Sequence, residues 1–267
     1  MNWRSAGIII GILAVFCIAL VFSFLYPFST STPPHLAPSE QQFSFEEADE
    51  YRVTGSITID DQTRYDVDGV VTADDERYAV IESRVSTAEL YQPGPGGDRY
   101  TRVTFEDETE ADRLIDSIED DTDRKPLEIT EGDEVVVEYL LEDAGRTPNS
   151  LENEARYVIG NFVHIPYAET DEAGDNTTYE PQDAWIAQGD RRVADTTGSV
   201  DVDTETRAVK SANVSWEQTR LQRLTYLNYL LTTIVADESS TWEVTYEFET
   251  GGVDVETPDW VKDAQNE

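Results

Sequence analysis

The longest apolar stretch of the chain is the feature that most constrains its fold. The stretch from Ala6 to Phe28 contains no acidic or basic side chain, and the nearest charged residues are Arg4 and Glu40. A helix that rises about 1.5 Å per residue would be about 34 Å long here, enough to cross the roughly 30 Å hydrocarbon core of a bilayer. The alternative, a buried helix in a soluble core, rarely has so long an uncharged run. The sequence therefore predicts a transmembrane helix within residues 1–28.

The residues around this stretch predict how the anchor is used. A secretory signal needs small residues at its cleavage site, whereas this stretch has Phe22, Phe24 and Leu25, which favours an uncleaved signal anchor. Arg4 precedes the stretch and the next basic residue is Arg52, so the positive-inside rule predicts a short cytoplasmic N-terminus. We expect a single-pass protein of the cell membrane whose C-terminal domain is extracellular.

Composition divides the rest of the chain into two parts. Residues 29–42 are rich in Pro, Ser and Thr, and this composition is typical of an extended, semi-rigid linker. No second linker interrupts residues 43–267, so we expect one domain there.

The charge balance of the chain is strongly acidic. There are 56 Asp and Glu against 19 Lys and Arg, a formal net charge of −37. Such a chain repels itself at ordinary ionic strength, but in 1 M salt the Debye length falls to about 3 Å and the repulsion is screened. The composition therefore indicates a protein of an extreme halophile, with an acidic surface that keeps it solvated. Nucleic acid is excluded as a partner because phosphate binding needs clustered Lys and Arg.

Hydrophobic periodicity predicts an α+β domain dominated by strands. A period of two indicates strands over residues 51–59, 65–71, 78–91, 100–105, 126–142, 199–203, 208–216 and 242–248. The strands 199–203 and 208–216 are predicted to form a hairpin with a turn at residues 204–207. A helical period predicts helices over residues 110–119 and 150–163, the first with a capping box from Thr109 to Asp112. The segment from Leu221 to Ala236 fits either a helix or a strand. Polar turns between the first strands predict an antiparallel meander.

Motif searches argue against an enzyme. The chain has no nucleophile elbow, phosphate loop, dinucleotide fingerprint or H-E-x-x-H motif, and acidic pairs are expected by chance among so many carboxylates. Cys17 is the single cysteine, and the only histidines, His35 and His164, are far apart, so we expect neither a metal site nor a cofactor. The sequons at Asn176 and Asn213 are possible glycosylation sites, and Asn176 lies in the more polar surroundings.

Four segments together resemble a known family. They are residues 198–206, 211–216, 244–248 and 256–261, which read GSVDVDTET, SANVSW, VTYEF and ETPDWV. They are similar to the C-terminal half of haloarchaeal envelope lipoproteins of the LolA/LppX-like type. The resemblance implies a curved antiparallel sheet, an open or half barrel, with a few helices on its concave face around an apolar cavity. The chain lacks the lipoprotein processing cysteine, which favours a tethered protein over a mobile carrier.

The resemblance implies a function as well as a fold. It implies a membrane-tethered module that binds a lipid or another hydrophobic ligand in the cell envelope. The alternative hypothesis is a non-catalytic structural or interaction protein of the cell surface with other envelope proteins as partners. The residues that we expect on the inner face of the sheet, as a cavity lining or as ordinary core, are Val53, Ile57, Tyr65, Val67, Tyr139, Val214, Trp216, Tyr246 and Phe248.

Overall fold

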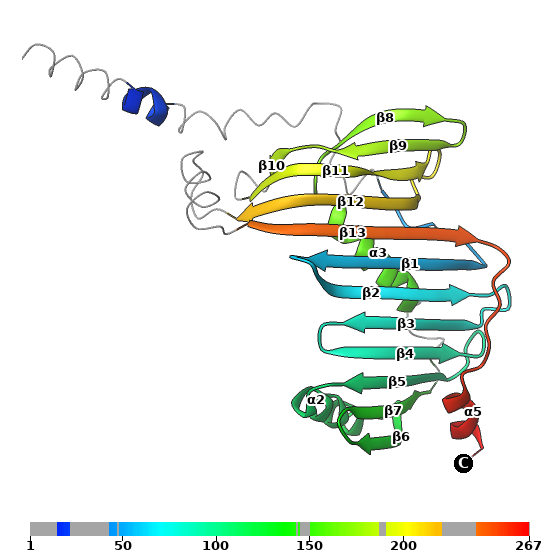
Figure 1. Cartoon of the computed structure of the whole chain (residues 1–267). Helices are drawn as coiled ribbons and strands as arrows, with labels where there is room; N and C mark the ends of the chain where they lie inside the picture. Colours follow the sequence, from blue (N-terminus) through cyan, green and yellow to red (C-terminus); the bar gives the residue numbers. More distant parts are fainter. Residues whose placement is uncertain are drawn as a thin grey trace, which may run out of the picture.

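The computed structural model describes residues 15–21, 43–46, 48–142, 144, 150–186, 191–220 and 239–266. Most of them belong to a single antiparallel sheet of thirteen strands, seen nearly face-on in Figure 1. Along the sheet the order is β6-β7-β5-β4-β3-β2-β1-β13-β12-β11-β9-β8, and β10 pairs with β11 beside this path. The strands in chain order are β1 (Tyr51–Ile59), β2 (Gln62–Val71), β3 (Arg77–Ser83), β4 (Ser86–Gln92), β5 (Arg99–Phe105), β6 (Arg124–Glu131), β7 (Val135–Leu141), β8 (Tyr167–Ala173), β9 (Asn176–Pro181), β10 (Ala184–Ile186), β11 (Arg191–Asp203), β12 (Val209–Arg220) and β13 (Ser239–Thr250).

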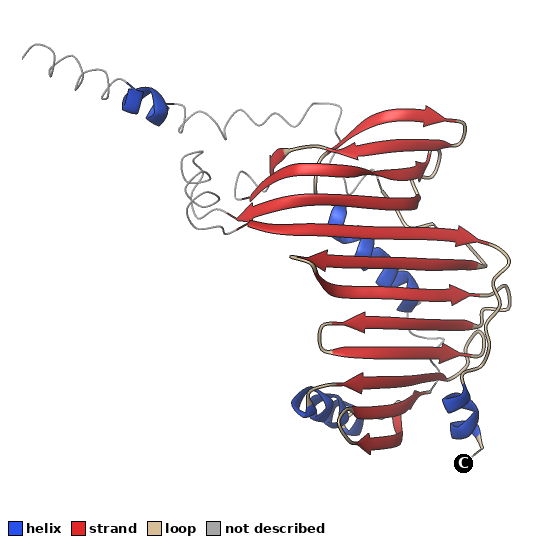
Figure 2. Ribbon diagram, in the orientation of Figure 1, coloured by secondary structure: helices blue, strands red, loops and turns tan. Residues whose placement is uncertain are grey.

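Alternation of apolar and polar residues gives the sheet two different faces. In β1, Tyr51, Val53 and Ile57 are buried, while Arg52, Thr54 and Ser56 carry polar side chains on the other side. Two helices, α2 (Glu108–Glu119) and α3 (Ser150–Phe162), cover the apolar side, which we call the helix face. We call the other side of the sheet the open face. The short helix α5 (Asp259–Gln265) packs on it (Figure 2).

The largest buried cluster lies between α3 and the middle of the sheet. Leu151, Val158 and Phe162 of α3 join buried residues of β1, β2, β12 and β13 in this cluster. Gly69 of β2 permits the contact, because a Cβ atom there would lie 2.4 Å from Cδ1 of Leu151. The helix therefore rests directly on the backbone of the sheet, with no space between the two layers at this point.

The predicted fold class is wrong in its arrangement of helices. We expected an open or half barrel with a few helices gathered on its concave face. The structure instead has one continuous sheet with helices on both faces. The physical reason lies in β3, β4 and β5, where Tyr78, Tyr91 and Tyr100 form a cross-strand row on the open face and give α5 an apolar surface to cover.

The predicted membrane anchor is also contradicted. Residues 15–21 form an exposed helix that is about 10 Å long at 1.5 Å per residue, a third of a hydrocarbon core. No helix in the described part of the chain combines the length and the apolar character that a bilayer crossing requires. The predictions of a transmembrane protein and of a single-pass location with an extracellular domain are therefore corrected. The remainder of the predicted span, and the predicted linker over residues 29–42, lie outside the described residues.

Most of the predicted elements are present, with two corrections. The helices over 110–119 and 150–163 are confirmed as α2 and α3, although Asp107, and not Thr109, caps α2 by accepting a 2.7 Å hydrogen bond from the backbone N–H of Thr109. The single strands expected over residues 78–91 and 126–142 are each a hairpin. The ambiguous segment from Leu221 to Ala236 lies outside the described residues.

Candidate functional site

The nine predicted cavity residues lie in two separate clusters on the helix face. Seven are buried in the cluster under α3: Val53, Ile57, Val67, Val214, Trp216, Tyr246 and Phe248. Tyr65 packs against the same cluster and donates a hydrogen bond from its hydroxyl to Glu154 of α3. Tyr139 lies apart from them, in the smaller cluster under α2.

A recess on the open face has the features of a binding site. It has a volume of about 200 Å³ and lies between α5 and the strands β5, β6 and β7. Ligand pockets commonly measure about 300–1,000 Å³, so this recess has room for a group smaller than a drug-sized molecule. Its lining consists of Arg102, Leu127, Glu128, Glu138, Trp260, Asp263 and Ala264.

A partly buried ion pair forms one part of the recess. Arg102 and Glu138 are cross-strand partners on β5 and β7, and Nη2 of Arg102 lies 2.7 Å from Oε1 of Glu138. Nε of Arg102 donates a 2.8 Å hydrogen bond to the same oxygen. Glu138 is the one acidic or basic residue buried in the described ranges, with 6% of its surface exposed. Burying a carboxylate is costly, and the pairing with Arg102 offsets this cost.

The second carboxylate oxygen of Glu138 gives the recess a vacant acceptor. Both contacts from Arg102 reach Oε1, and none of the described residues donates a hydrogen bond to Oε2. An ionised carboxylate has about four acceptor positions on its two oxygens. Glu138 can therefore accept a further hydrogen bond from a group that enters the recess.

Trp260 of α5 forms another wall of the recess. The residue is 7% exposed, and the guanidinium carbon of Arg102 lies 4.9 Å from the centroid of its ring, a cation–π distance. The indole Nε1 donates a 3.2 Å hydrogen bond to Glu89 of β4. Pro258 precedes the first turn of α5, where its fixed φ and missing N–H are tolerated. The helix thus holds an aromatic face beside the ion pair.

The charges around the recess favour a cation. Glu128 and Asp263 are exposed and lie at its rim, so the lining carries three carboxylates against the single guanidinium of Arg102. Leu127 and the ring of Trp260 add apolar surface. The arrangement suits a group with a positive end and an apolar stem, such as a lysine or arginine side chain.

Two further predictions concern metals and glycans. The described residues contain no group of three or more His, Cys, Asp and Glu that could hold a metal ion. Asn176 is exposed beside the turn between β8 and β9, and Asn213 is exposed on the open face of β12. Both side chains are accessible, and their glycosylation stays a prediction.

Sequence reasoning missed the three residues that define the recess. Glu138 offered a signal, because it is the only charged residue in the apolar run from Val135 to Leu141. Arg102 had no such signal, since a charged residue on the outward side of a strand is ordinary. Trp260 was noticed only as part of the segment 256–261 that carried the resemblance.

Comparison with known proteins gives this chain no relative. No family model, no curated protein and no solved structure matches it, so the LolA/LppX-like resemblance stays a prediction.

Proposed function

We propose that the protein is a non-catalytic interaction module that receives a lysine or arginine side chain of a partner protein in the recess beside α5. The observation that carries the proposal is the vacant acceptor Oε2 of Glu138, a buried carboxylate in a recess with an excess of negative charge. Trp260 provides a surface for the aliphatic stem or the cation.

The burial of Glu138 distinguishes it from the many exposed carboxylates of this acidic chain. A net charge of −37 attracts basic partners, but salt screens exposed charges that are more than a Debye length apart. Pairs that are partly buried are screened much less. In the concentrated salt that the composition indicates, Glu138 keeps its attraction for a cation when the exposed carboxylates have lost most of theirs.

The hypothesis of an apolar ligand has less support from the geometry. Eight of the nine residues predicted to line its cavity pack together with α3 on the helix face. A Cβ atom added to Gly55 of β1 would lie 3.1 Å from a methyl of Val158, so the helix touches the sheet there as it does at Gly69. Interiors packed in this way leave few voids larger than a water molecule. We therefore favour the interaction module over the lipid-binding module.

Peptide titration of the full chain tests the proposal. The probe is acetyl-Gly-Lys-Gly-amide, added in 2 M KCl while the indole N–H signal of Trp260 is followed by ¹⁵N-resolved NMR. We expect a saturable shift of this signal with the lysine peptide and none with the peptide that has norleucine in place of lysine. Equal shifts with both peptides would show that the recess accepts an apolar chain and would contradict the proposal.

A pair of isosteric variants completes the test. Glu138→Gln keeps the shape of the side chain but removes its charge, and we expect at least a tenfold weaker affinity for the lysine peptide. Glu243→Gln removes the same charge from the open face of β13, away from the recess, and should bind like the unmodified protein. Equal weakening in both variants would mean that only the overall charge matters.

A further inference from the structure

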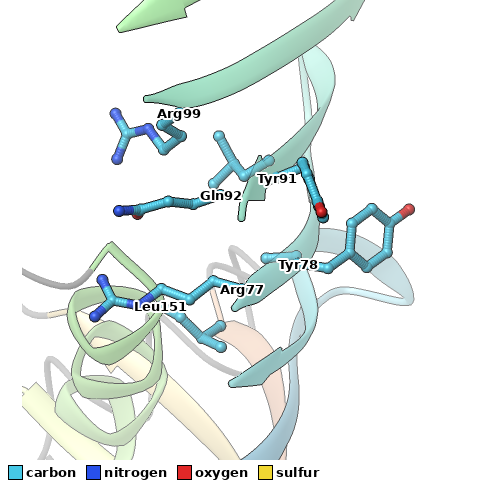
Figure 3. A pocket seen from close by; sticks show the side chains of 8 residues that line it. Arg77, Tyr78, Tyr91, Gln92, Arg99 and Leu151 are labelled. Carbon is cyan, nitrogen blue, oxygen red and sulfur yellow. The ribbon is translucent and has the colours of Figure 1, made fainter. Parts of the chain in front are cut away.

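A second polar cluster lies on the opposite side of the sheet from the recess. Arg77, Gln92 and Arg99 occupy one cross-strand row on β3, β4 and β5, because Arg77 pairs with Gln92 and the Tyr91–Tyr100 pair places Gln92 opposite Arg99. Figure 3 shows these three side chains extending to the same side as Leu151, while Tyr78 and Tyr91 lie on the other side. The row continues through Leu141 to Arg124 on β6.

The arginines of this row differ in their partners. Arg77 forms an ion pair with Asp75 at 2.6 Å, and Arg124 forms one with Asp121 at 3.2 Å. The Nε of Arg99 is buried and has no hydrogen-bond partner among the described residues. Leaving the buried Nε–H of Arg99 without an acceptor is unfavourable, and the chain places this half-buried side chain near Arg77 and Arg124 although acidic residues outnumber basic ones threefold.

Burial and nearby positive charges both disfavour the charged form of Arg99. Burial lowers the pKa of Arg99 from its usual value, and the positive charges of Arg124 and Arg77 lower it further. An arginine remains protonated in proteins nevertheless, so the site keeps its charge. Thr101, the next residue of β5 on the same face, also has a buried hydroxyl oxygen without a hydrogen-bond partner. Two unsatisfied polar groups thus neighbour each other on one strand.

A small hollow is lined in part by Arg99, whose Nε is unsatisfied. Its free volume is about 10 Å³, and its lining includes Arg77, Gln92, Arg99, Ala79, Leu90 and Leu151. This is about the size of a single water-sized particle. The amide of Gln92 donates to the carbonyl oxygens of Gly94 and Gly97, at 3.1 and 3.3 Å, which fixes Gln92 in place.

We propose that this hollow, the Arg99 site, binds one monatomic anion, chloride in physiological salt, held by the N–H groups of Arg99 with Arg77 beside it. A water molecule would fit the volume but would leave the positive charge unbalanced. A monatomic anion is the smallest group that balances the charge, and Leu90 and Leu151 provide apolar walls that a larger hydrated ion would not favour.

Bromide gives a direct structural test on the unmodified protein. Crystals grown in KBr, with data collected at the bromine absorption edge, should show an anomalous peak in hydrogen-bonding contact with Nε of Arg99. Electron density for water at this position, without an anomalous peak, would overturn the proposal whether or not any variant folds.

Halide-dependent stability gives a second test in solution. At constant ionic strength, replacing gluconate by chloride should raise the midpoint of thermal unfolding through binding to the folded state. Arg99→Gln should lose most of this rise, whereas Arg113→Gln, which removes an exposed arginine of α2, should keep it. An unchanged rise in Arg99→Gln would contradict the anion site. Neither result depends on the peptide titration at the recess, because the two sites lie on opposite faces.

Discussion

Strand β5 carries two arginines on opposite faces of the sheet, and only one of them has a carboxylate partner among the described residues. On the open face, Arg102 stands opposite Glu138 of β7 and binds its carboxylate at 2.7 Å. On the helix face, Arg99 stands opposite Leu141 of the same strand and has no described partner. The cross-strand neighbour therefore decides whether a charge on this strand is neutralised by the protein itself. On the open face, Oε2 of Glu138 accepts no hydrogen bond from a described residue. On the helix face, the Nε–H of Arg99 has no described acceptor.

Breaking the pair on the open face should have the largest effect. Glu138→Ala removes the partner of Arg102 and leaves a charge that is 31% exposed. We expect a loss of about 3 kcal/mol in the free energy of unfolding, the lower end for broken buried pairs, since Arg102 keeps some contact with water. Urea unfolding measures this change. A loss smaller than that of an exposed surface pair would mean that Glu138 does not stabilise Arg102, and the contrast between Arg102 and Arg99 would disappear.

Removing the unpaired charge on the helix face should have the opposite sign. Arg99→Met replaces the guanidinium by an apolar chain beside Leu90 and Leu151. We expect an increase of about 1 kcal/mol in the free energy of unfolding in gluconate, where no halide fills the site. The same urea titration in chloride should show a smaller gain. A destabilised variant in gluconate would indicate that Arg99 has a favourable partner.

His164 is a further basic side chain without a described carboxylate partner, and unlike Arg99 it can lose its charge. Burial lowers the pKa of His164 below its usual 6.5, and the positive charge of Arg191 adds to this shift. The folded state then favours the neutral imidazole, so its contribution to stability is complete above pH 6.5 and is lost as the pH falls through the lowered pKa. Thermal unfolding between pH 7.5 and 5 should show this loss. His164→Gln should reduce the slope, and an unchanged slope would assign it to other groups.

The smallest effect should come from an exposed pair on the open face. Arg52 and Asp68 lie 2.7 Å apart, and their side chains are 46% and 47% exposed. Asp68→Ala should cost about 0.5 kcal/mol, because solvent screens both charges. Measured by urea unfolding beside Glu138→Ala, it isolates the contribution of burial. Similar losses in the two variants would remove the distinction between the pairs.

Local patterns in the sequence were sufficient to predict much of the sheet. The alternation in Val53, Ile57 and Val67 correctly placed these side chains on one face, and the periodicity around Leu114 and Val158 correctly indicated helices. The turn at Arg84 and Val85 was missed because neither residue is a typical turn former, so β3 and β4 were taken as one strand.

Non-local features were beyond this reasoning. The position of α5 depends on a row of three tyrosines that only the strand register brings together. The ion pair in the recess joins residues of β5 and β7, which are separated in sequence by α2 and β6. The apolar run before residue 29 predicted a membrane span from composition alone, and this prediction was wrong for the described helix. Neither the recess nor the Arg99 site has a motif, since each is formed by residues from separate strands.

The pairing of β1 with β13 has a consequence for the order of folding. β1 begins at Tyr51 and pairs through its full length with β13, which ends at Thr250. On the ribosome, the meander from β1 to β5 can therefore form long before β13 has been synthesised, and one edge of β1 stays unpaired in the meantime. An unpaired edge can recruit strands from other chains. Gly55 and the charged Arg52 on that strand leave it a weaker template than a continuous apolar strand would be. The sheet is therefore complete only after β13 has been synthesised and has paired with β1 and β12.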